Sequence, residues 1–147
     1  MHFITGGAFN GKRSWVKNNF NIMNSNWLSA YEGHPLPVEL DDITADLIVL
    51  EGIEIWIKGL TEEHDAAQCR VIWNRCLTHW ERWEKTKNHQ LILIGTDMTK
   101  GIVPIEKENR IWRDVTGWAF QDLAAKADKV DVIWYGINQT IKGGMIV

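Results

Sequence analysis

Cysteine, surplus positive charge and long apolar runs are scarce in this chain, and each scarcity excludes a class of protein. Two cysteines in 147 residues are too few for a small domain held together by disulfides. The formal net charge is −3, whereas a protein that binds a nucleic-acid duplex normally carries a basic face. No apolar run approaches the ~20 residues that span a bilayer. We therefore expect neither a nucleic-acid partner nor a membrane span.

The N-terminus and the two cysteines indicate a reducing compartment. The chain begins with MHFITGG, which lacks the basic and apolar regions of a signal peptide, so we expect a cytoplasmic protein. Cys69 and Cys76 lie in a segment that is expected to be helical, about two turns apart and too distant for a strain-free disulfide. The cysteines and histidines form no metal-binding spacing either. Both thiols are expected to be buried and reduced.

Short apolar strands alternate with helices along the chain. Strands are expected at four apolar runs, 2–5, 46–50, 91–94 and 130–135. Helices are expected from Ser14 to about Asn19, from an N-cap at Thr61 to about Lys87, and over 106–126. Residues 20–42 are expected to form a loop with one short helical turn, and 144–147 an edge strand. This alternation predicts the α/β fold class, with a mostly parallel sheet flanked by helices in a single domain over residues 1–147.

The loop after the first expected strand carries the strongest functional signal. Its residues, Gly6, Gly7, Ala8, Phe9, Asn10, Gly11 and Lys12, match G-x-x-x-x-G-K, the phosphate loop of P-loop proteins. Small residues let successive backbone N–H groups face one phosphate, and the following helix adds partial positive charge. Lys12 would reach the outer phosphates and neutralise charge during catalysis. A glycine turn that merely ends a strand is the alternative, but the position between a strand and a helix favours the P-loop nucleotide-binding fold.

The residue after the lysine departs from this pattern. A Ser or Thr at this position contributes its hydroxyl to a bound Mg²⁺, whereas this chain has Arg13. Ser14 follows one residue later, about 100° around the helix, and is poorly placed to substitute. Two readings stay open: Arg13 itself holds phosphate charge, or it marks a loss of catalysis.

Acidic residues at strand ends are candidate metal ligands. Glu51 closes the run DLIVLE, where an acid would hold Mg²⁺ directly or through water. Asp97 follows LILIGT and is a similar candidate, because ligands bind at the carboxyl ends of parallel strands. A solvated strand-end carboxylate is an equally good reading of Glu51 alone. Glu54 is better explained as an acid at a helix N-terminus, and His34 has no partner placed by spacing.

Three stretches together resemble one known family. TGGAFNGK is similar to the TGGxRSGKS opening of the bifunctional adenosylcobinamide kinase/adenosylcobinamide-phosphate guanylyltransferases of cobalamin biosynthesis. LIVLEGIEIWIKGL resembles their strand with a terminal acid followed by C-L-T-x-W-x-x-N-L. A third stretch resembles their N-E-V-G-x-G-I-V-P segment with the R-x-x-R-D stretch and apolar strand after it; its sequence is TDMTKGIVPIEKENRIWRDVTGWAFQDLAAKADKVDVIWYGI. The similarity covers residues 3–14 and about 46–142.

This resemblance implies a mostly parallel P-loop fold, a trimer, and GTP or ATP with Mg²⁺ as cofactors. Family members phosphorylate a hydroxyl of adenosylcobinamide and then attach GMP through a covalent guanylyl-histidine. By resemblance, Gly6–Ser14 would bind nucleotide phosphates, Glu51 would match the strand-end acid, and Asp97 would stand in the family's Asn-Glu position. The stretch from Trp27 to Glu32 resembles a W-x-T-x-E segment with one extra residue, which makes Glu32 a further candidate.

One family segment has no counterpart here. The family places a strand and the motif R-I-x-x-H-x-x-R-R-P, with the guanylylated histidine, before the W-x-T-x-E segment. Only Lys17 to Asn26 precede Trp27 at that place, so the histidine is expected to be deleted. The sequence therefore predicts either a kinase-type enzyme that lacks guanylyl transfer, or a non-catalytic or regulatory nucleotide-binding paralogue. A small P-loop kinase for another substrate is a third, weaker reading.

Overall fold

The computed structural model describes residues 1–86, 88–98 and 105–144. Six strands form one sheet in the order β2-β3-β4-β1-β5-β6, and every neighbouring pair is parallel except β5 with β6. The elements in chain order are β1 (His2–Gly6), α1 (Lys12–Asn19), β2 (Ser25–Ser29), the 3-10 turn η1 (Ala30–Glu32), β3 (Leu47–Glu51), α2 (Ile53–Glu63), α3 (Ala66–Lys85), β4 (Gln90–Thr96), α4 (Lys107–Lys126), β5 (Lys129–Trp134) and β6 (Ile137–Lys142). The predicted α/β class with a mostly parallel sheet is confirmed.

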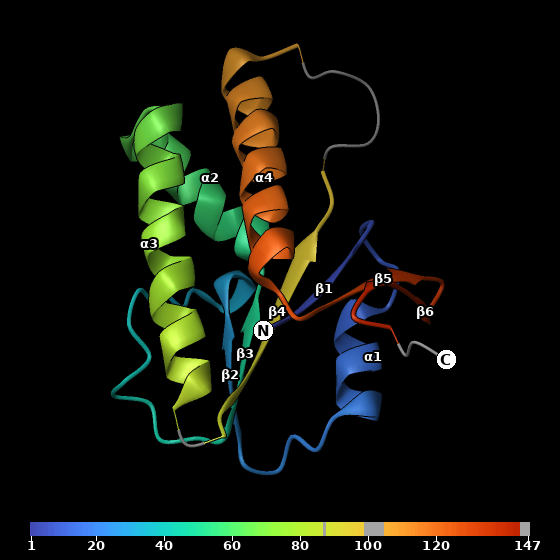
Figure 1. Cartoon of the computed structure of the whole chain (residues 1–147). Helices are drawn as coiled ribbons and strands as arrows, with labels where there is room; N and C mark the ends of the chain where they lie inside the picture. Colours follow the sequence, from blue (N-terminus) through green and yellow to red (C-terminus); the bar gives the residue numbers. More distant parts are fainter. Residues whose placement is uncertain (87, 99–104, 145–147) are drawn as a thin grey trace.

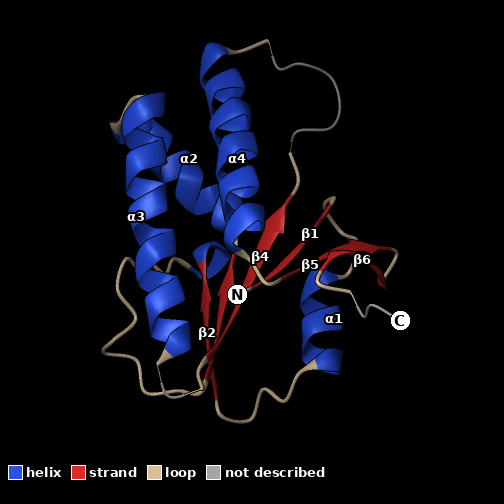
Figure 2. Cartoon of the chain, in the orientation of Figure 1, coloured by secondary structure: helices blue, strands red, loops and turns tan. Residues whose placement is uncertain are grey.

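Helices cover both faces of the sheet, with α2, α3 and α4 on one side and α1 on the other (Figures 1 and 2). Alternate strand residues therefore enter different cores. Phe3 and Leu50 pack under the three helices, whereas Ile4 and Val49 pack against Val16 of α1. Burial on both faces explains why these strands read as continuous apolar runs. No helix in the described part of the chain is long and apolar enough to cross a membrane.

Helix α3 carries much of the larger core. The Trp73 indole is 1% exposed, and its Nε1 donates a hydrogen bond of 2.9 Å to the carbonyl of Ala119 on α4. This bond satisfies the buried N–H group and ties the two helices together. Cys69 and Cys76 lie on the same helix, buried and unbridged, as their spacing predicts.

The long helix expected from Thr61 is wrong, because two helices occupy that segment. Thr61 lies in the last turn of α2, and α3 begins after Asp65. The Asp65 carboxylate accepts from the backbone N–H of Gln68 at 2.8 Å, and the Gln68 side chain accepts from the backbone N–H of Asp65 at 3.1 Å. This capping box starts a new helix four residues after the expected N-cap. α3 ends at Lys85; Lys87 lies outside the described residues.

Two further predictions about strands are also wrong. Residues 25–29 form β2 within the segment expected to be a loop, where β2 pairs with β3 at the sheet edge. The C-terminal edge strand is Ile137–Lys142 rather than 144–147; Gly144 lies outside any strand, and 145–147 are outside the described residues. Tyr135 and Gly136 both have positive φ, 53° and 74°, as a tight two-residue hairpin turn requires. This turn places the antiparallel strand directly after β5.

Candidate functional site

A cleft of about 480 Å³ opens at the carboxyl ends of β1, β3 and β4. This edge is where open parallel sheets bind ligands. The cleft is lined by loop and helix residues 8–14 together with Tyr31, Glu51, Glu54, Thr96 and Trp112. The structure thus brings the predicted phosphate loop and the predicted strand-end acid Glu51 to one place.

Glycine is required at both ends of the phosphate loop. Gly6 has φ of +143°, and a Cβ there would lie 2.4 Å from the carbonyl oxygen of Ile133 on β5. Gly11 has φ of +86°, and its Cβ would meet the Cα of Gly136 at 3.3 Å. These conformations and close backbone contacts admit no larger residue without strain. Gly6 and Gly11 therefore allow the backbone path that residues 6–11 take between β1 and α1.

Two backbone hydrogen bonds fix the loop against its neighbours. The N–H of Asp97 donates to the carbonyl of Gly6 at 2.9 Å, and the N–H of Gly136 donates to the carbonyl of Asn10 at 2.8 Å. The loop is thus anchored to the end of β4 on one side and to the β5–β6 turn on the other. Phe9 at its tip has φ of 60° and a fully exposed ring. Asp97, a predicted site residue, lies beside the loop through this backbone contact.

The N-terminus of α1 faces the same cleft. Gly11 is its N-cap, and a glycine offers no side chain to satisfy the first N–H groups. The N–H groups of Lys12, Arg13 and Ser14 have no acceptor within the helix, because the first turn of any α-helix leaves them unpaired. The first turn contains a lysine and an arginine instead of acids. Such a terminus attracts anions through its dipole and its donors.

Lys12 is the buried cation of the cleft. Its residue surface is only 8% exposed, and its Nζ donates to the carbonyl of Gly7 at 2.8 Å. Burial lowers the pKa of Lys12, while the charges of Glu54 and then Glu51 oppose that shift. Burial makes an unbalanced positive charge on Lys12 costly, and a phosphate in the cleft would balance that charge.

Arg13 binds the predicted metal ligand. Its Nε donates to Oε2 of Glu51 at 2.9 Å, and its Nη2 donates to Oε1 of Glu51 and to Oε1 of Glu32 at 3.3 Å. The Trp27 indole Nε1 also donates to Oε1 of Glu51 at 3.2 Å. Burial raises the pKa of Glu51, but hydrogen bonds from Arg13, Ser29 and Trp27 outweigh it, so the pKa is lowered. The structure therefore places Glu32 and Glu51 together on one guanidinium.

A second buried acid in the cleft was not predicted as a site residue. Glu54 is 4% exposed, and it accepts from the hydroxyl of Tyr31 and from the backbone N–H of Thr96 at 2.9 Å. Burial and this hydrogen bond to Glu54 raise the pKa of Tyr31. Trp112 closes the same wall, and its Nε1 donates to the carbonyl of Glu54 at 2.8 Å. In the sequence Glu54 reads as a helix-start acid, and only the packing of α4 shows that it lines a cleft.

The donors around Glu51 do not fit a metal ion. Both oxygens of Glu51 accept from Arg13, and Glu54 is held by Tyr31 and Thr96. Across residues 1–86, 88–98 and 105–144, no three His, Cys, Asp or Glu side chains gather as a metal site would require. Mg²⁺ at Glu51 stays a prediction from the sequence, and the contacts with Arg13 favour another partner for that carboxylate.

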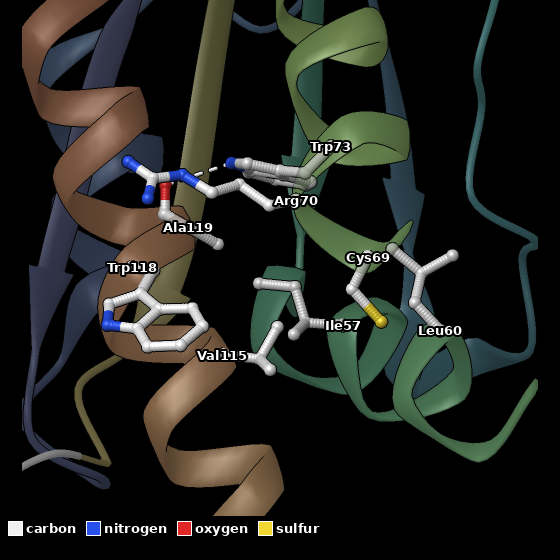
Figure 3. Close-up of a pocket in the computed structure, with 8 residues that line it drawn as sticks. All are labelled: Ile57, Leu60, Cys69, Arg70, Trp73, Val115, Trp118 and Ala119. Atoms are coloured by element: carbon white, nitrogen blue, oxygen red, sulfur yellow. Dashed lines mark hydrogen bonds between the residues drawn. The ribbon is translucent and has the colours of Figure 1, made fainter. Parts of the chain in front are cut away.

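Two other features of the described chain are structural. The Nδ1 of His34 accepts from the backbone N–H of Ser29 at 3.1 Å, and the carbonyl of His34 accepts from Trp56 at 2.7 Å, so this histidine fixes the end of β2. A recess among α2, α3 and α4, beside Trp73 and Trp118, has a volume of only about 10 Å³. Figure 3 shows its lining, which is apolar apart from Arg70. It is too small for any ligand beyond a water molecule.

The comparison with known families agrees with this geometry. The family model described as cobinamide kinase / cobinamide phosphate guanyltransferase matches residues 23–141. The match includes β3 with Glu51, α4 and β5, and it begins after the phosphate loop. The prediction of a phosphate loop therefore rests on its own motif and on the loop's conformation. No curated protein matches the chain.

Proposed function

Because the chain belongs to the cobinamide kinase / cobinamide phosphate guanyltransferase family, we propose that it binds GTP or ATP through the phosphate loop in cobalamin biosynthesis. The observation that carries this proposal is the loop itself, which meets the N-terminus of α1 and buried Lys12 in one cleft. Backbone N–H groups, a helix dipole and a lysine are the groups that hold a phosphate chain. Glu32, Glu51 and Asp97 lie around this loop as candidate contacts.

The activity we propose is kinase-type phosphoryl transfer to a hydroxyl of adenosylcobinamide. The hydroxyl oxygen attacks the γ-phosphorus, the bond from that phosphorus to the bridging oxygen breaks, and the nucleoside diphosphate leaves with the bonding electrons. Lys12 and the α1 terminus stabilise the charge on the phosphoryl oxygens. Glu51 and Glu54 both line the cleft, but Glu51 is paired with the Arg13 guanidinium, whereas Glu54 accepts from the neutral Tyr31 hydroxyl and the Thr96 N–H. Glu54, beside Lys12, therefore takes the hydroxyl proton.

Turnover with adenosylcobinamide tests this activity. Incubation with ATP or GTP should yield the nucleoside diphosphate and a cobinamide heavier by one phosphoryl group, both measured by mass spectrometry. Glu54→Gln keeps the size and the acceptor oxygen but removes the base, so the rate should fall by about 10²-fold or more. Lys85→Met, at an exposed position of α3, is the control and should leave the rate unchanged. An unaltered rate for Glu54→Gln would remove this residue from the mechanism.

A non-catalytic or regulatory nucleotide-binding paralogue is the second candidate, and the Arg13–Glu51 pair favours it. The chain from residue 3 to residue 33 contains no histidine, and only residues 20–24 connect α1 to β2. Guanylyl transfer through the family's histidine segment is therefore not proposed. Labelled GTP should leave no acid-labile adduct on the protein. Nucleotide binding without any turnover would support the paralogue instead of the kinase.

We also propose a trimer in the cytoplasm, on the family resemblance and the sequence. The β5–β6 hairpin exposes Trp134, Tyr135, Ile137 and Ile141, each more than half accessible, and such a group of apolar side chains suits a subunit contact. Light scattering coupled to size-exclusion chromatography should give three times the monomer mass of 17.0 kDa. A monomer at micromolar concentration would contradict this part of the proposal.

A further inference from the structure

Arg13 occupies the place that the phosphate-loop pattern reserves for metal coordination. The pattern has a hydroxyl at this position for Mg²⁺, and the nearby acid Glu51 was the expected second ligand. We propose that the Arg13 guanidinium replaces the divalent cation between Glu51 and the nucleotide, so that nucleotide binding here is independent of Mg²⁺. This inference rests on the proposed nucleotide binding and goes further by assigning the charge that the metal would supply.

The first observation is that Arg13 already occupies both oxygens of Glu51. Its carboxylate is 5% exposed, and Arg13 approaches it as a fork, with Nε 2.9 Å from Oε2 and Nη2 2.5 Å from Oε1. Bidentate pairs of this kind are among the strongest charge-assisted contacts. Trp27 adds a donor to Oε1 at 3.2 Å. A metal ion could use Glu51 only after displacing the guanidinium from a nearly buried carboxylate, and that exchange is costly.

The second observation is that part of the Arg13 guanidinium is still available to bind another group. Arg13 lines the cleft, and its side chain is 42% exposed. Its Nε and Nη2 are engaged by Glu51 and Glu32, whereas Nη1 makes no hydrogen bond to a described residue. Arginine carries five N–H donors, so the two on Nη1 stay available. Planar guanidinium donors suit phosphate oxygens better than a flexible ammonium does.

The third observation is that the Trp27 ring holds the Arg13 guanidinium in place. Its central carbon lies 5.5 Å from the centre of the Trp27 ring, close enough for a cation–π contact. Trp27 belongs to β2, which pairs with the strand that ends in Glu51. The ring and the carboxylate therefore fix one orientation of Arg13, as a metal site would fix its ion.

The charge balance agrees with this assignment. An unpaired Glu51 would repel the phosphates, and in metal-dependent sites the ion cancels that repulsion. Here the positive charge of Arg13 offsets the charge of the buried Glu51. The carboxylate of Glu32 is 56% exposed and screened by solvent, and Lys12 remains as the cation for the outer phosphates. Ser14, the only hydroxyl in the first turn of α1, lies about 100° from the metal-binding position.

Calorimetric titration with GTP and with ATP tests the inference, once in excess EDTA and once in excess Mg²⁺. The wild-type dissociation constant should change by less than about twofold between the two conditions. Arg13→Ser restores the hydroxyl and frees Glu51, so its affinity should be weak in EDTA and rise about tenfold with Mg²⁺. Lys17→Ser is the matched control, because Lys17 lies on the same helix and over the same Trp27 ring, also at 5.5 Å. This control should behave as the wild type does.

Glu51→Gln tests whether the carboxylate positions Arg13 or binds a metal ion. If Glu51 positions Arg13, the substitution should weaken nucleotide binding equally in EDTA and in Mg²⁺; a loss seen only in Mg²⁺ would identify a metal ligand and overturn the inference. Wild-type binding that requires Mg²⁺ would also overturn it, while leaving the proposed nucleotide binding intact. Absence of binding in both conditions would reject both proposals. The wild-type comparison needs no variant, so it decides the question even where Arg13→Ser fails to fold.

Discussion

The Arg13–Glu51 pair should contribute measurably to folding, and its removal should leave a pH-dependent signature. Breaking a fully buried ion pair by deleting one partner costs about 3–5 kcal/mol, whereas an exposed pair contributes about 1 kcal/mol or less. This pair is intermediate, because the Glu51 side chain is 6% exposed and the Arg13 side chain 42%. We expect Arg13→Ala to lower the free energy of unfolding by about 2 kcal/mol at pH 7. For about 150 residues this corresponds to a fall in Tm of about 4–8 °C.

The sign of the pH dependence follows from Glu51. Its pKa in the folded wild type is lowered, because hydrogen bonds led by Arg13 outweigh burial. The stability that it contributes is therefore present above the unfolded pKa, about 4.3, and is lost as the pH falls through the lower folded value. Without Arg13, the burial of Glu51 is opposed only by the hydrogen bonds from Ser29 and Trp27, so the pKa of Glu51 rises from its wild-type value. The difference between wild type and Arg13→Ala should consequently narrow as the pH falls from 7 towards 4.

Urea unfolding followed by tryptophan fluorescence between pH 4 and pH 8 measures this difference. Lys17→Ala, an exposed change on the same helix, should shift the free energy by less than about 0.5 kcal/mol. The double variant Arg13→Ala with Glu51→Gln should recover more than half of the loss, because no unpaired carboxylate remains buried. A loss below about 0.5 kcal/mol, or one that is constant across the pH range, would refute the reasoning.

Two other features of the structure can be tested, the close contact at Gly6 and the burial of Cys76. Gly6→Ala should cost about 3 kcal/mol in unfolding free energy, because its Cβ would lie 2.4 Å from the Ile133 carbonyl oxygen at a φ of +143°. Gly136→Ala, with φ of +74° and open space for a Cβ, should cost only about 1 kcal/mol, and equal losses in chemical denaturation would contradict the assigned contact. Burial raises the pKa of the Cys76 thiol to about 11, so iodoacetamide at pH 8 should modify Cys76 only in unfolded protein. Rapid modification of the native protein, followed by mass spectrometry, would show that this burial is wrong.

The strand, loop and helix of residues 2–14 were predictable because their signal is local. Glycines at fixed offsets, a strand before them and a helix after them all lie within residues 2–14, and Gly6 and Gly11 have the positive φ that the motif requires. The buried strands β1, β3 and β4 were equally visible, because burial on both faces leaves uninterrupted apolar runs. Glu51 followed from its position at the end of such a run.

The remaining errors arise where tertiary contacts or weak caps decide. β2 has the sequence SNWLS and is only half buried at the sheet edge, so it lacks the apolar pattern of a strand. The start of α3 depends on Asp65 and Gln68, a pair less conspicuous than Thr61 followed by two glutamates. Tyr135 has φ of 53°, which is unusual for a tyrosine, and the hairpin to β6 was therefore missed.

The arrangement within the cleft could not be read from the sequence. Arg13 and Glu51 are 38 residues apart, and Trp112 reaches Glu54 across 58 residues. Such contacts depend on the order of strands and the packing of α4, which no local pattern specifies. The motif therefore predicted residues that line the cleft, while the partner of Glu51 emerged only from the fold.

The proposed function depends most directly on whether residues 6–14 bind the phosphates of a nucleotide. Titration calorimetry of the wild type, Lys12→Met and Lys85→Met with GTP and with ATP measures this. We expect the wild type and Lys85→Met to bind at least one of the two with the same affinity. Lys12→Met, which removes the buried cation but keeps the length of the chain, should bind at least about tenfold more weakly. Absence of binding by the wild type, or an unchanged affinity in Lys12→Met, would contradict the central claim.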